Sequence, residues 1–398
     1  MMSPRKKENN AGHESTLLSL TMPSETLFGA GCVGAVADAA AALGAHAFLL
    51  TGPRGAQPGG LTDHIRDELV TREMGGTVYR FDGYEPTIRD IDAAADACAA
   101  AGCDLIVGLG GASVIDAAKL VAVLCGHDAE SIEPFLVGEC AFERAGLPLV
   151  VVPTVAVIGT EIMGTAFAVD EEARCKRSVS HRHVMPTCVA IDPELTVSTP
   201  PRLTAAAGVG TFTLALEAFV SRRSNPLTET FALEAIRLVG EYLRRAVADG
   251  TNIDARTALC LAAYLAGSAA TGAGLGVVNL LASALQHALG AEYGEAAALV
   301  LPASIEFNLY HARDKYAQVA ELLATALRTD VRNLGDLLVT FCADIGIDKT
   351  ITAYTLDYRI VDETLTAIAQ CGGRAETNPR PLDRAGLVRI LRHARAYI

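Results

Sequence analysis

The chain has 398 residues, of which 51% are hydrophobic, and it contains no tryptophan. Its 33 lysines and arginines stand against 46 aspartates and glutamates, which gives a formal net charge of −13. An acidic chain without a basic cluster is poorly suited to nucleic acid or anionic membranes, so we expect neither as a partner. The length allows a large hydrophobic core and about two domains.

Cysteine usage and the start of the chain bear on the cellular compartment. The cysteines number 10, are scattered from Cys32 to Cys371, and never show the spacing CxxC. We therefore expect reduced thiols in a cytoplasmic protein rather than a disulfide framework. Residues 1–19 are polar and lack the apolar run of a secretory signal, which predicts a disordered tail. The run LGVVNLLASALQHALGA is interrupted by Asn, Gln and His, which favours a buried helix over a membrane span.

Strand and helix patterns alternate through the first half of the chain. Short, mostly apolar segments predict strands over residues 45–51, 77–83, 104–110 and 148–154, and helical patterns, most of them Ala-rich, predict helices over 33–43, 63–74, 88–102 and 114–125. The last strand pattern lies within residues 188–195, and from about residue 200 the pattern is helical. This order predicts an α/β domain with a parallel sheet over residues 20–197 and an all-helical domain over residues 198–398.

A glycine-rich turn follows one of the predicted strands, in DLIVGLGGASVIDAAKL (residues 104–120). Gly110 and Gly111 would let the backbone approach a pyrophosphate, and the helix that follows offers unpaired N–H groups at its positive end. Ser113 can cap this helix or contact phosphate. The spacing matches neither GxGxxG nor a Walker loop, so a tight turn without a ligand is the alternative.

Several segments then resemble, in order, the motifs of one enzyme family. GGASVIDAAK (residues 110–119) resembles the GGGSxxDxxK signature of the iron-containing (group III) alcohol dehydrogenases. Similar segments are LFGAG (27–31), EPT (85–87), VPTVAVIGTE (152–161), MPTCVAIDPELTVSTPPRLTAAAG (185–208) and NPRPL (378–382). The resemblance implies a Rossmann-like N-terminal domain, a helical C-terminal domain of the dehydroquinate synthase-like fold, a nicotinamide cofactor, a small-molecule substrate and a homo-oligomer.

The resemblance also implies which residues contact the cofactor: Gly110, Gly111, Ala112, Ser113, Thr154, Gly159 and Lys176. NAD-preferring relatives have an acid near Gly52 that binds the ribose 2′-hydroxyl. Here the strand ends in Thr51, no acid follows, and Arg54 is close. We therefore expect Gly52 and Arg54 at the adenosine ribose, with NADP(H) slightly favoured over NAD(H). The alternative is that Arg54 is a solvated loop residue.

The family binds iron or zinc through an Asp, a His four residues later and two further His residues. In the matching register these positions hold Gly210, Leu214, Asn279 and Tyr293, and the histidine that relatives use near the substrate is Ser283. Glycine and leucine side chains cannot bind a transition metal, and Asn and Tyr are poor substitutes for imidazole. We therefore expect no metal, and we expect Gly210, Leu214, Asn279 and Ser283 to border the substrate instead.

Without a metal, a carbonyl reduction needs another proton donor or electrophile. Tyr293 is the first candidate and His287, in the same apolar run, is the second; packing or helix capping are the alternatives for both. These features predict a metal-independent NAD(P)H-dependent oxidoreductase that reduces a carbonyl or oxidises an alcohol of a small or specialised metabolite. A repurposed non-redox enzyme (cyclase, isomerase or lyase) using the same cleft, or a non-catalytic homologue, remains open.

Overall fold

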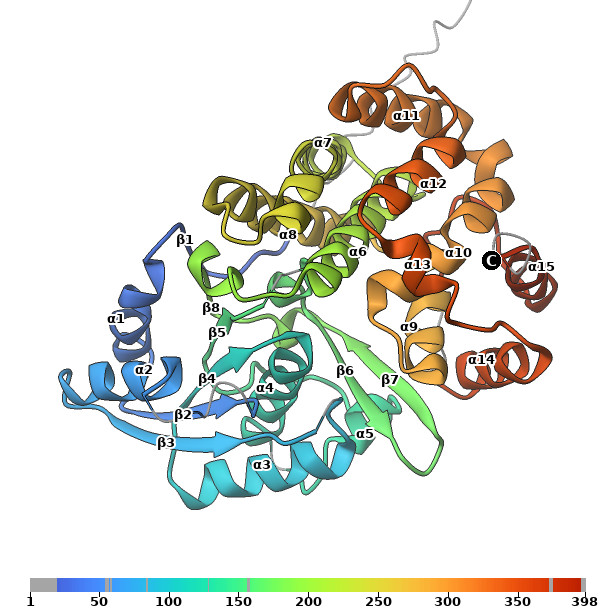
Figure 1. Ribbon diagram of the computed structural model, residues 1–398. Coiled ribbons are helices and arrows are strands. Elements are labelled where there is room, and N and C mark those ends of the chain that lie inside the picture. Colours follow the sequence, from blue (N-terminus) through green and yellow to red (C-terminus); the bar gives the residue numbers. More distant parts are fainter. Residues whose placement is uncertain are drawn as a thin grey trace, which may run out of the picture.

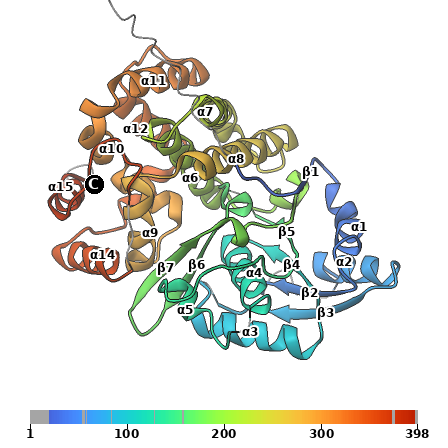
Figure 2. The ribbon, with the colours of Figure 1, turned by 180° about the vertical axis from the view of Figure 1, so that it is seen from behind.

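The computed structural model describes residues 20–53, 57, 59–83, 85–127, 129–155, 158–371 and 375–394. The expected tail, residues 1–19, and the expected cofactor residue Arg54 lie outside this range. An α/β part and a helical part lie side by side, and Figures 1 and 2 show them from opposite directions. The predicted fold class, a parallel-sheet α/β domain followed by a helical domain, is confirmed.

The α/β part is built on a six-stranded sheet in which every neighbouring pair of strands is parallel. In spatial order its strands are β1 (Glu25–Phe28), β8 (Cys188–Ile191), β5 (Leu149–Pro153), β4 (Leu105–Gly110), β2 (His46–Thr51) and β3 (Gly75–Arg80). After β3 the chain crosses back over β2 to form β4, so the strand order reverses between β2 and β4. Ligands of such sheets bind beyond the carboxyl ends of the strands at this reversal.

Helices cover both faces of this sheet. In β2, Phe48 and Leu50 belong to one core cluster, whereas Ala47 and Leu49 belong to the other. The first cluster lies under α3 (Ile88–Ala100) and α4 (Ala112–Cys125), with α5 (Glu133–Leu136) beside them, and the second lies under α1 (Val36–Ala41) and α2 (Leu61–Val70). Strands buried on both faces are continuous apolar runs, which is why the sequence predicts them well.

An antiparallel hairpin, which the sequence analysis did not predict, joins the two parts. Its strands are β6 (Thr165–Asp170) and β7 (Cys175–Ser180). Strand β6 packs on α4, whereas β7 packs on α9 (Val277–Leu289) and α14 (Tyr358–Gln370) of the helical part. Both strands mix polar and apolar residues, so they lack the apolar run that marks the central strands. The hairpin lies between the α/β part and the helical part (Figure 1).

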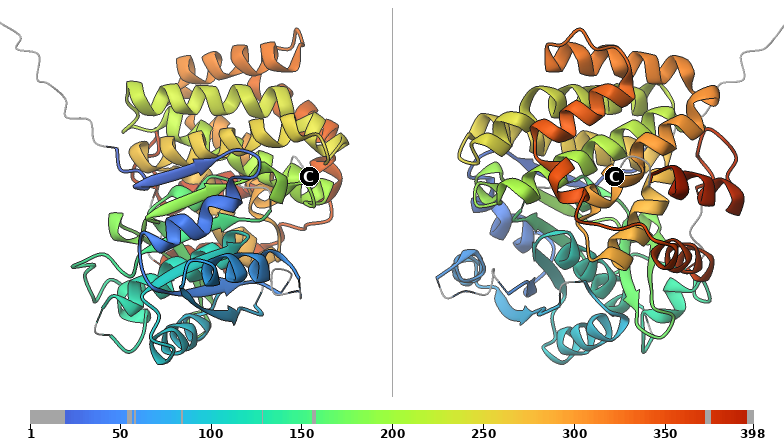
Figure 3. Two further views of the ribbon diagram at one scale, coloured as in Figure 1. Left: turned by 90° about the vertical axis from the view of Figure 1, so that its left-hand side faces the viewer. Right: turned by 45° about the vertical axis from the view of Figure 1, so that its right-hand side comes forward.

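The helical part is a stack of packed helices, with α11 farthest from the sheet (Figure 3). Besides α9 and α14 it contains α6 (Pro201–Val220), α7 (Pro226–Ala248), α8 (Ile253–Ala273), α10 (Tyr293–Asn308), α11 (Arg313–Leu327), α12 (Leu334–Asp344), α13 (Ile347–Ile351) and α15 (Arg384–Ala394). Among the described helices, α6 alone could cross a membrane by length and composition; α8 and α9 qualify only as a pair bent by 114°. Of the most apolar window of α6, 89% is buried, so core packing accounts for its composition.

One pair of cysteines joins the two parts covalently. Cys175, the first residue of β7, and Cys371, directly after α14, form a disulfide with their Cα atoms 6.5 Å apart. The expectation of reduced thiols throughout is therefore wrong for this pair, although the other cysteines are free. Spacing rules could not reveal the bond, because the two cysteines are 196 residues apart in the chain.

Candidate active site

The glycine-rich turn between β4 and α4 leaves the first N–H groups of α4 without a side-chain cap. Helix α4 begins at Ala112, and its N-cap residue Gly111 makes no side-chain capping hydrogen bond. A Cβ atom at Gly110 would lie 2.6 Å from the Cβ of Val114, so only glycine allows the strand end to approach the helix this closely. The uncapped N–H groups and the positive end of the helix dipole favour an anionic group such as pyrophosphate.

A cavity of about 580 Å³, called the cofactor cavity below, lies at this turn. Its lining includes the predicted cofactor residues Gly52, Gly110, Gly111, Ala112, Ser113 and Thr154. Gly52 follows β2 and Gly110 ends β4, so the cavity lies where the strand order reverses. Asp82, just beyond β3, also lines the cavity and forms an ion pair with Arg80. Asp82 was not predicted as a cofactor residue, because an acid for the ribose 2′-hydroxyl was expected only at the end of β2.

Gly159 was expected at the cofactor, but it lines neither this cavity nor the second one described below. Its φ is 107°, and a Cβ atom would lie 2.5 Å from the carbonyl oxygen of Ala263 in α8. Close packing of the loop against α8 therefore explains the glycine.

A second cavity of about 660 Å³, called the substrate cavity below, is lined from both parts of the molecule. The predicted site residues in its lining are Lys176, Leu214, Asn279, Ser283, His287 and Tyr293. The residues that line both cavities are Ala112, Ser113, Ile158, Thr160, Gln286 and Tyr293. The two cavities are thus neighbours, and Tyr293 stands at their junction.

Tyr293 is held by two other residues of the predicted site. Its hydroxyl donates a hydrogen bond to Oδ1 of Asn279 across 3.0 Å. Its ring lies against Gly210, where a Cβ atom would be 3.1 Å from the ring atom Cδ1. Burial, with the nearby charge of Glu217, raises the pKa of Tyr293 well above its usual value, so the phenol keeps its proton at neutral pH.

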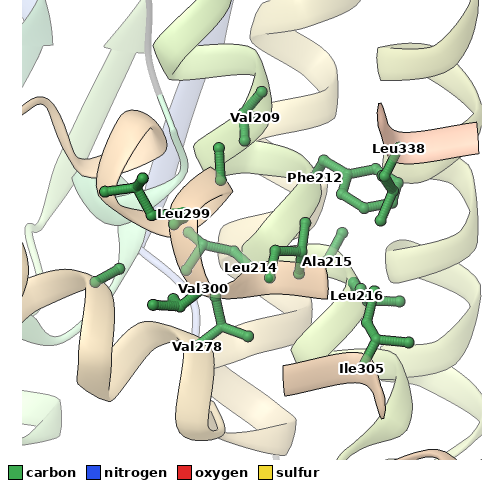
Figure 4. Close-up of a cluster of buried hydrophobic side chains, with 14 of the residues drawn as sticks. Val209, Phe212, Leu214, Ala215, Leu216, Val278, Leu299, Val300, Ile305 and Leu338 are labelled. Atoms are coloured by element: carbon green, nitrogen blue, oxygen red, sulfur yellow. The ribbon is translucent and has the colours of Figure 1, made fainter. Parts of the chain in front are cut away.

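Leu214 lies one helical turn after Gly210 and is 1% exposed. Figure 4 shows it among apolar side chains that include Val278 of α9 and Val300 of α10. Leu214 therefore gives the substrate cavity an apolar wall at this point. In the described part of the chain, no three His, Cys, Asp or Glu side chains lie close enough together to hold a metal ion.

A buried carboxylate fixes the start of α9 and with it Asn279. Glu217 of α6 accepts hydrogen bonds from the backbone N–H groups of Gly276 (3.1 Å), Val278 (2.7 Å) and Asn279 (3.0 Å). It caps a helix to which it does not belong, since α9 has no side-chain cap of its own. Burial raises the pKa of Glu217 to about 7, although the three N–H groups favour the charged form.

Glu85, Lys176 and His287 form a polar cluster at the substrate cavity. Glu85 accepts from Nζ of Lys176 at 2.6 Å through Oε1, and its Oε2 lies 3.3 Å from Nδ1 of His287. Nζ of Lys176 also donates to the side-chain oxygen of Gln286 at 3.3 Å. Burial alone would raise the pKa of Glu85, but hydrogen bonds and charge from His287 and Lys176 outweigh it and hold the pKa at about 2. Lys176 and His287 were predicted as site residues, but Glu85 was not, although it is the first residue of the motif EPT (85–87).

Lys119 and Asp116, two further residues of the signature GGASVIDAAK, have positions that were not predicted from the sequence. Nζ of Lys119 is buried and donates to the carbonyl oxygens of Thr160 (2.6 Å), Met163 (2.7 Å) and Thr165 (3.0 Å), so it fixes the chain leading into β6. Asp116 lines the substrate cavity, and burial raises its pKa to about 7 against the opposing charges of Lys119 and Lys176.

Comparison with known proteins accounts for both halves of the chain. The family profile "Iron-containing alcohol dehydrogenase" matches residues 23–193, and "Fe-containing alcohol dehydrogenase family, C-terminal" matches residues 204–395. This chain belongs to the iron-containing alcohol dehydrogenase family. The resemblance that the motifs predicted is therefore confirmed, and the chain is a homologue of alcohol dehydrogenases.

Individual relatives of this family cover from three quarters to nearly all of the chain. "Probable alcohol dehydrogenase EutG" of Salmonella typhimurium is 31% identical over 93% of this chain and 93% of its own length. The NAD-dependent methanol dehydrogenase of Bacillus methanolicus is 30% identical over 76% of this chain and 79% of its own. The crystal structure of a 1,3-propanediol oxidoreductase, 28% identical, superposes with a TM-score of 0.83 over 95% of this chain and 100% of its own.

Proposed function

We propose that this protein is a metal-independent oxidoreductase that transfers a hydride between a nicotinamide dinucleotide and the carbonyl carbon of a small-molecule substrate. The observation that carries the proposal is the position of Tyr293. It lines both the glycine-loop cavity and the interdomain cavity, and it stands where the family resemblance assigns a metal ligand.

The residues at the four ligand positions do not fit a transition metal. Gly210 and Leu214 offer no donor atom, and Leu214 lies in an apolar cluster. Oδ1 of Asn279 already accepts a hydrogen bond from the hydroxyl of Tyr293, and the ring of Tyr293 packs directly against Gly210. We therefore assign no step of the reaction to a metal ion.

From the sequence, Tyr293 was the first candidate for the proton donor and His287 the second. We now assign different roles to the two residues. A general acid works best when its pKa lies near the operating pH, whereas the pKa of Tyr293 lies well above its usual value. We therefore assign Tyr293 and the side-chain N–H of Asn279 the task of donating hydrogen bonds to the substrate oxygen, which replaces Oδ1 of Asn279 as the acceptor of the Tyr293 hydroxyl. His287 donates the proton, because Glu85 orients its ring through Nδ1.

A reduced nicotinamide supplies the hydride when it is bound. The substrate oxygen then takes the proton from Nε2 of His287, and oxidation of an alcohol reverses both transfers. Among the described residues, Nε2 of His287 makes no hydrogen bond, so it is available for this role. Lys176 keeps Glu85 ionised and in place, since its Nζ lies 2.6 Å from Oε1.

The choice between NADP(H) and NAD(H) depends on the far end of the cofactor cavity. NADP(H) was expected to be favoured because the end of β2 carries no acid. This preference stays a prediction. Asp82 supplies a carboxylate from the neighbouring strand, and its ion pair with Arg80 reduces the repulsion that it would exert on a 2′-phosphate.

The test is reduction of short aldehydes and ketones with NADH and with NADPH by protein purified in the presence of EDTA and 1,10-phenanthroline. We expect turnover that chelators and added Fe²⁺ or Zn²⁺ change by less than about 2-fold, with well below one metal ion per chain by mass spectrometry. Activity that requires stoichiometric iron or zinc would overturn metal independence. Substrate conversion without added nicotinamide would indicate a non-redox enzyme, and bound cofactor without turnover of any carbonyl would indicate a non-catalytic homologue.

A further inference from the structure

The substrate cavity has a basic lining although the protein as a whole is acidic. Apart from Tyr293, the ionisable side chains in its lining are Asp116, Lys176, His181, Arg182, Arg223 and His287. Three of these carry a fixed positive charge, whereas the chain has a formal net charge of −13. Asp116 offsets this charge only in part near neutral pH, because burial raises its pKa to about 7.

Two of the basic residues differ from the rest of the site. Arg182 follows β7 in the α/β part, and Arg223 lies between α6 and α7 in the helical part, so they reach the cavity from different parts of the molecule. Both side chains are exposed, and neither forms an ion pair with a described residue. Lys176, by contrast, is committed to Glu85.

The cofactor does not account for these arginines. Its pyrophosphate is expected at the glycine turn, and neither Arg182 nor Arg223 lines the cavity at that turn. The electrostatic influence of Arg182 is felt within the site, since burial together with the charges of His183 and Arg182 lowers the pKa of His181. Guanidinium groups bind carboxylate, sulfonate and phosphonate groups through paired hydrogen bonds.

We propose that the substrate is an anionic carbonyl compound, whose carboxylate, sulfonate or phosphonate group is bound by Arg182 and Arg223 while its carbonyl group lies at Tyr293 and His287. This inference rests on the proposed function for its reaction, but the binding of the anion can be tested separately. A cavity of about 660 Å³ accommodates several carbon atoms between the two ends of such a substrate.

The experiment compares kcat/KM for 4-oxobutanoate, 2-oxoethanesulfonate and (2-oxoethyl)phosphonate with that for butanal. We expect at least one anionic compound to exceed butanal by about 10-fold or more, which corresponds to about 1.4 kcal/mol. The variants Arg182→Gln and Arg223→Gln should each reduce this preference by about 5-fold or more while changing kcat/KM for butanal by less than about 3-fold. The KM of the preferred anion should rise with ionic strength.

The matched control is Arg222→Gln, since Arg222 is also exposed and adjoins Arg223 but does not line the substrate cavity. Equal kcat/KM values for butanal and all three anions, or equal losses for both kinds of substrate in the arginine variants, would overturn the inference and leave the proposed function standing.

If no carbonyl compound reacts, the proposed function fails, and the anion site is tested by binding alone. Quenching of bound NADH or NADPH fluorescence by 4-hydroxybutanoate, but not by 1-butanol, would then support the inference if it is lost in Arg182→Gln and Arg223→Gln. Absence of such binding in the unmodified protein would overturn it.

Discussion

The hydroxyl group of Tyr293 donates a hydrogen bond to the side-chain oxygen of Asn279 across 3.0 Å. The two residues come from different helices, α10 and α9, and both occupy positions that the family resemblance assigns to metal ligands. A polar contact between two neutral side chains thus stands where a cation is expected in relatives. The phenol and the amide can present hydrogen-bond donors to a substrate oxygen in its place.

Removing the hydroxyl of Tyr293 tests its role without removing the ring. Tyr293→Phe should lower kcat/KM for the best carbonyl substrate by about 10²-fold, the loss expected for one donor to a developing oxyanion. The dissociation constant of the nicotinamide cofactor should change by less than about 3-fold. Steady-state kinetics and fluorescence titration measure the two quantities. The control is Tyr316→Phe, in a buried tyrosine that lines neither cavity; equal losses in both variants would contradict the role.

A methyl group at position 210 should displace the ring of Tyr293. A Cβ atom there would lie 3.1 Å from Cδ1 of Tyr293 and 3.2 Å from Cγ2 of Ile158. Alanine in place of glycine favours the helix by about 1 kcal/mol, so Gly210→Ala should stay folded, with a melting temperature within a few degrees. We expect kcat/KM to fall by about 10-fold or more. Gly34→Ala, where a Cβ meets nothing within 4 Å, should leave kcat/KM unchanged.

The ion cluster around Glu85 predicts a particular loss of stability in acid. The pKa of Glu85 is about 2 in the folded protein, below its usual value of 4.5, so the folded state binds this proton more weakly than the unfolded state. The resulting stabilisation is present above pH 4.5 and is lost as the pH falls from 4.5 towards 2. In Glu85→Gln the free energy of unfolding should therefore depend less on pH in this range, and the loss of stability on acidification should be smaller by on the order of 1–3 kcal/mol.

Urea denaturation between pH 3 and pH 6 measures this dependence in the two proteins. Glu130→Gln provides the control, because Glu130 is exposed and has no ion pair among the described residues. If the free energy of unfolding depended on pH to the same extent in Glu85→Gln and in the unmodified protein, the stabilising role of the ion cluster would be contradicted. The same variant should also lower kcat, since His287 loses the carboxylate that orients it.

Asp82 should set the choice between the two nicotinamide cofactors. Its carboxylate lines the cofactor cavity beside Gly52, where it opposes a 2′-phosphate and can accept a hydrogen bond from a 2′-hydroxyl. Asp82→Asn should therefore tighten NADPH relative to NADH by about 5- to 10-fold in dissociation constant. Asp67→Asn, an exposed acid on α2, should not change the ratio. An unchanged ratio in Asp82→Asn would remove Asp82 from cofactor selection.

The central sheet could be read from the sequence because its strands are buried on both faces. Within the predicted ranges 104–110 and 148–154, the observed strands β4 (LIVGLG) and β5 (LVVVP) are unbroken apolar runs. The hairpin β6–β7 was missed because each strand has only six residues and mixes buried with half-buried or exposed positions. β1 was missed because it spans four residues at the edge of the sheet.

Within the site, local motifs predicted residues but not their partners. The glycine turn is one continuous segment, so its cavity could be foreseen. Glu85 and His287, in contrast, are separated by 202 residues, and only the packing of the two parts brings them together. The fit of the Tyr293 ring against Gly210 likewise depends on how α10 crosses α6, which no local pattern encodes.

The disulfide between Cys175 and Cys371 ties the two walls of the substrate cavity at one point. The disulfide holds the Cα atoms of these residues 6.5 Å apart, so any movement that separated the two parts would have to be a rotation about this tether. In such a rotation each residue moves in proportion to its distance from the pivot. Lys176, the neighbour of Cys175, would therefore move least in such a rotation.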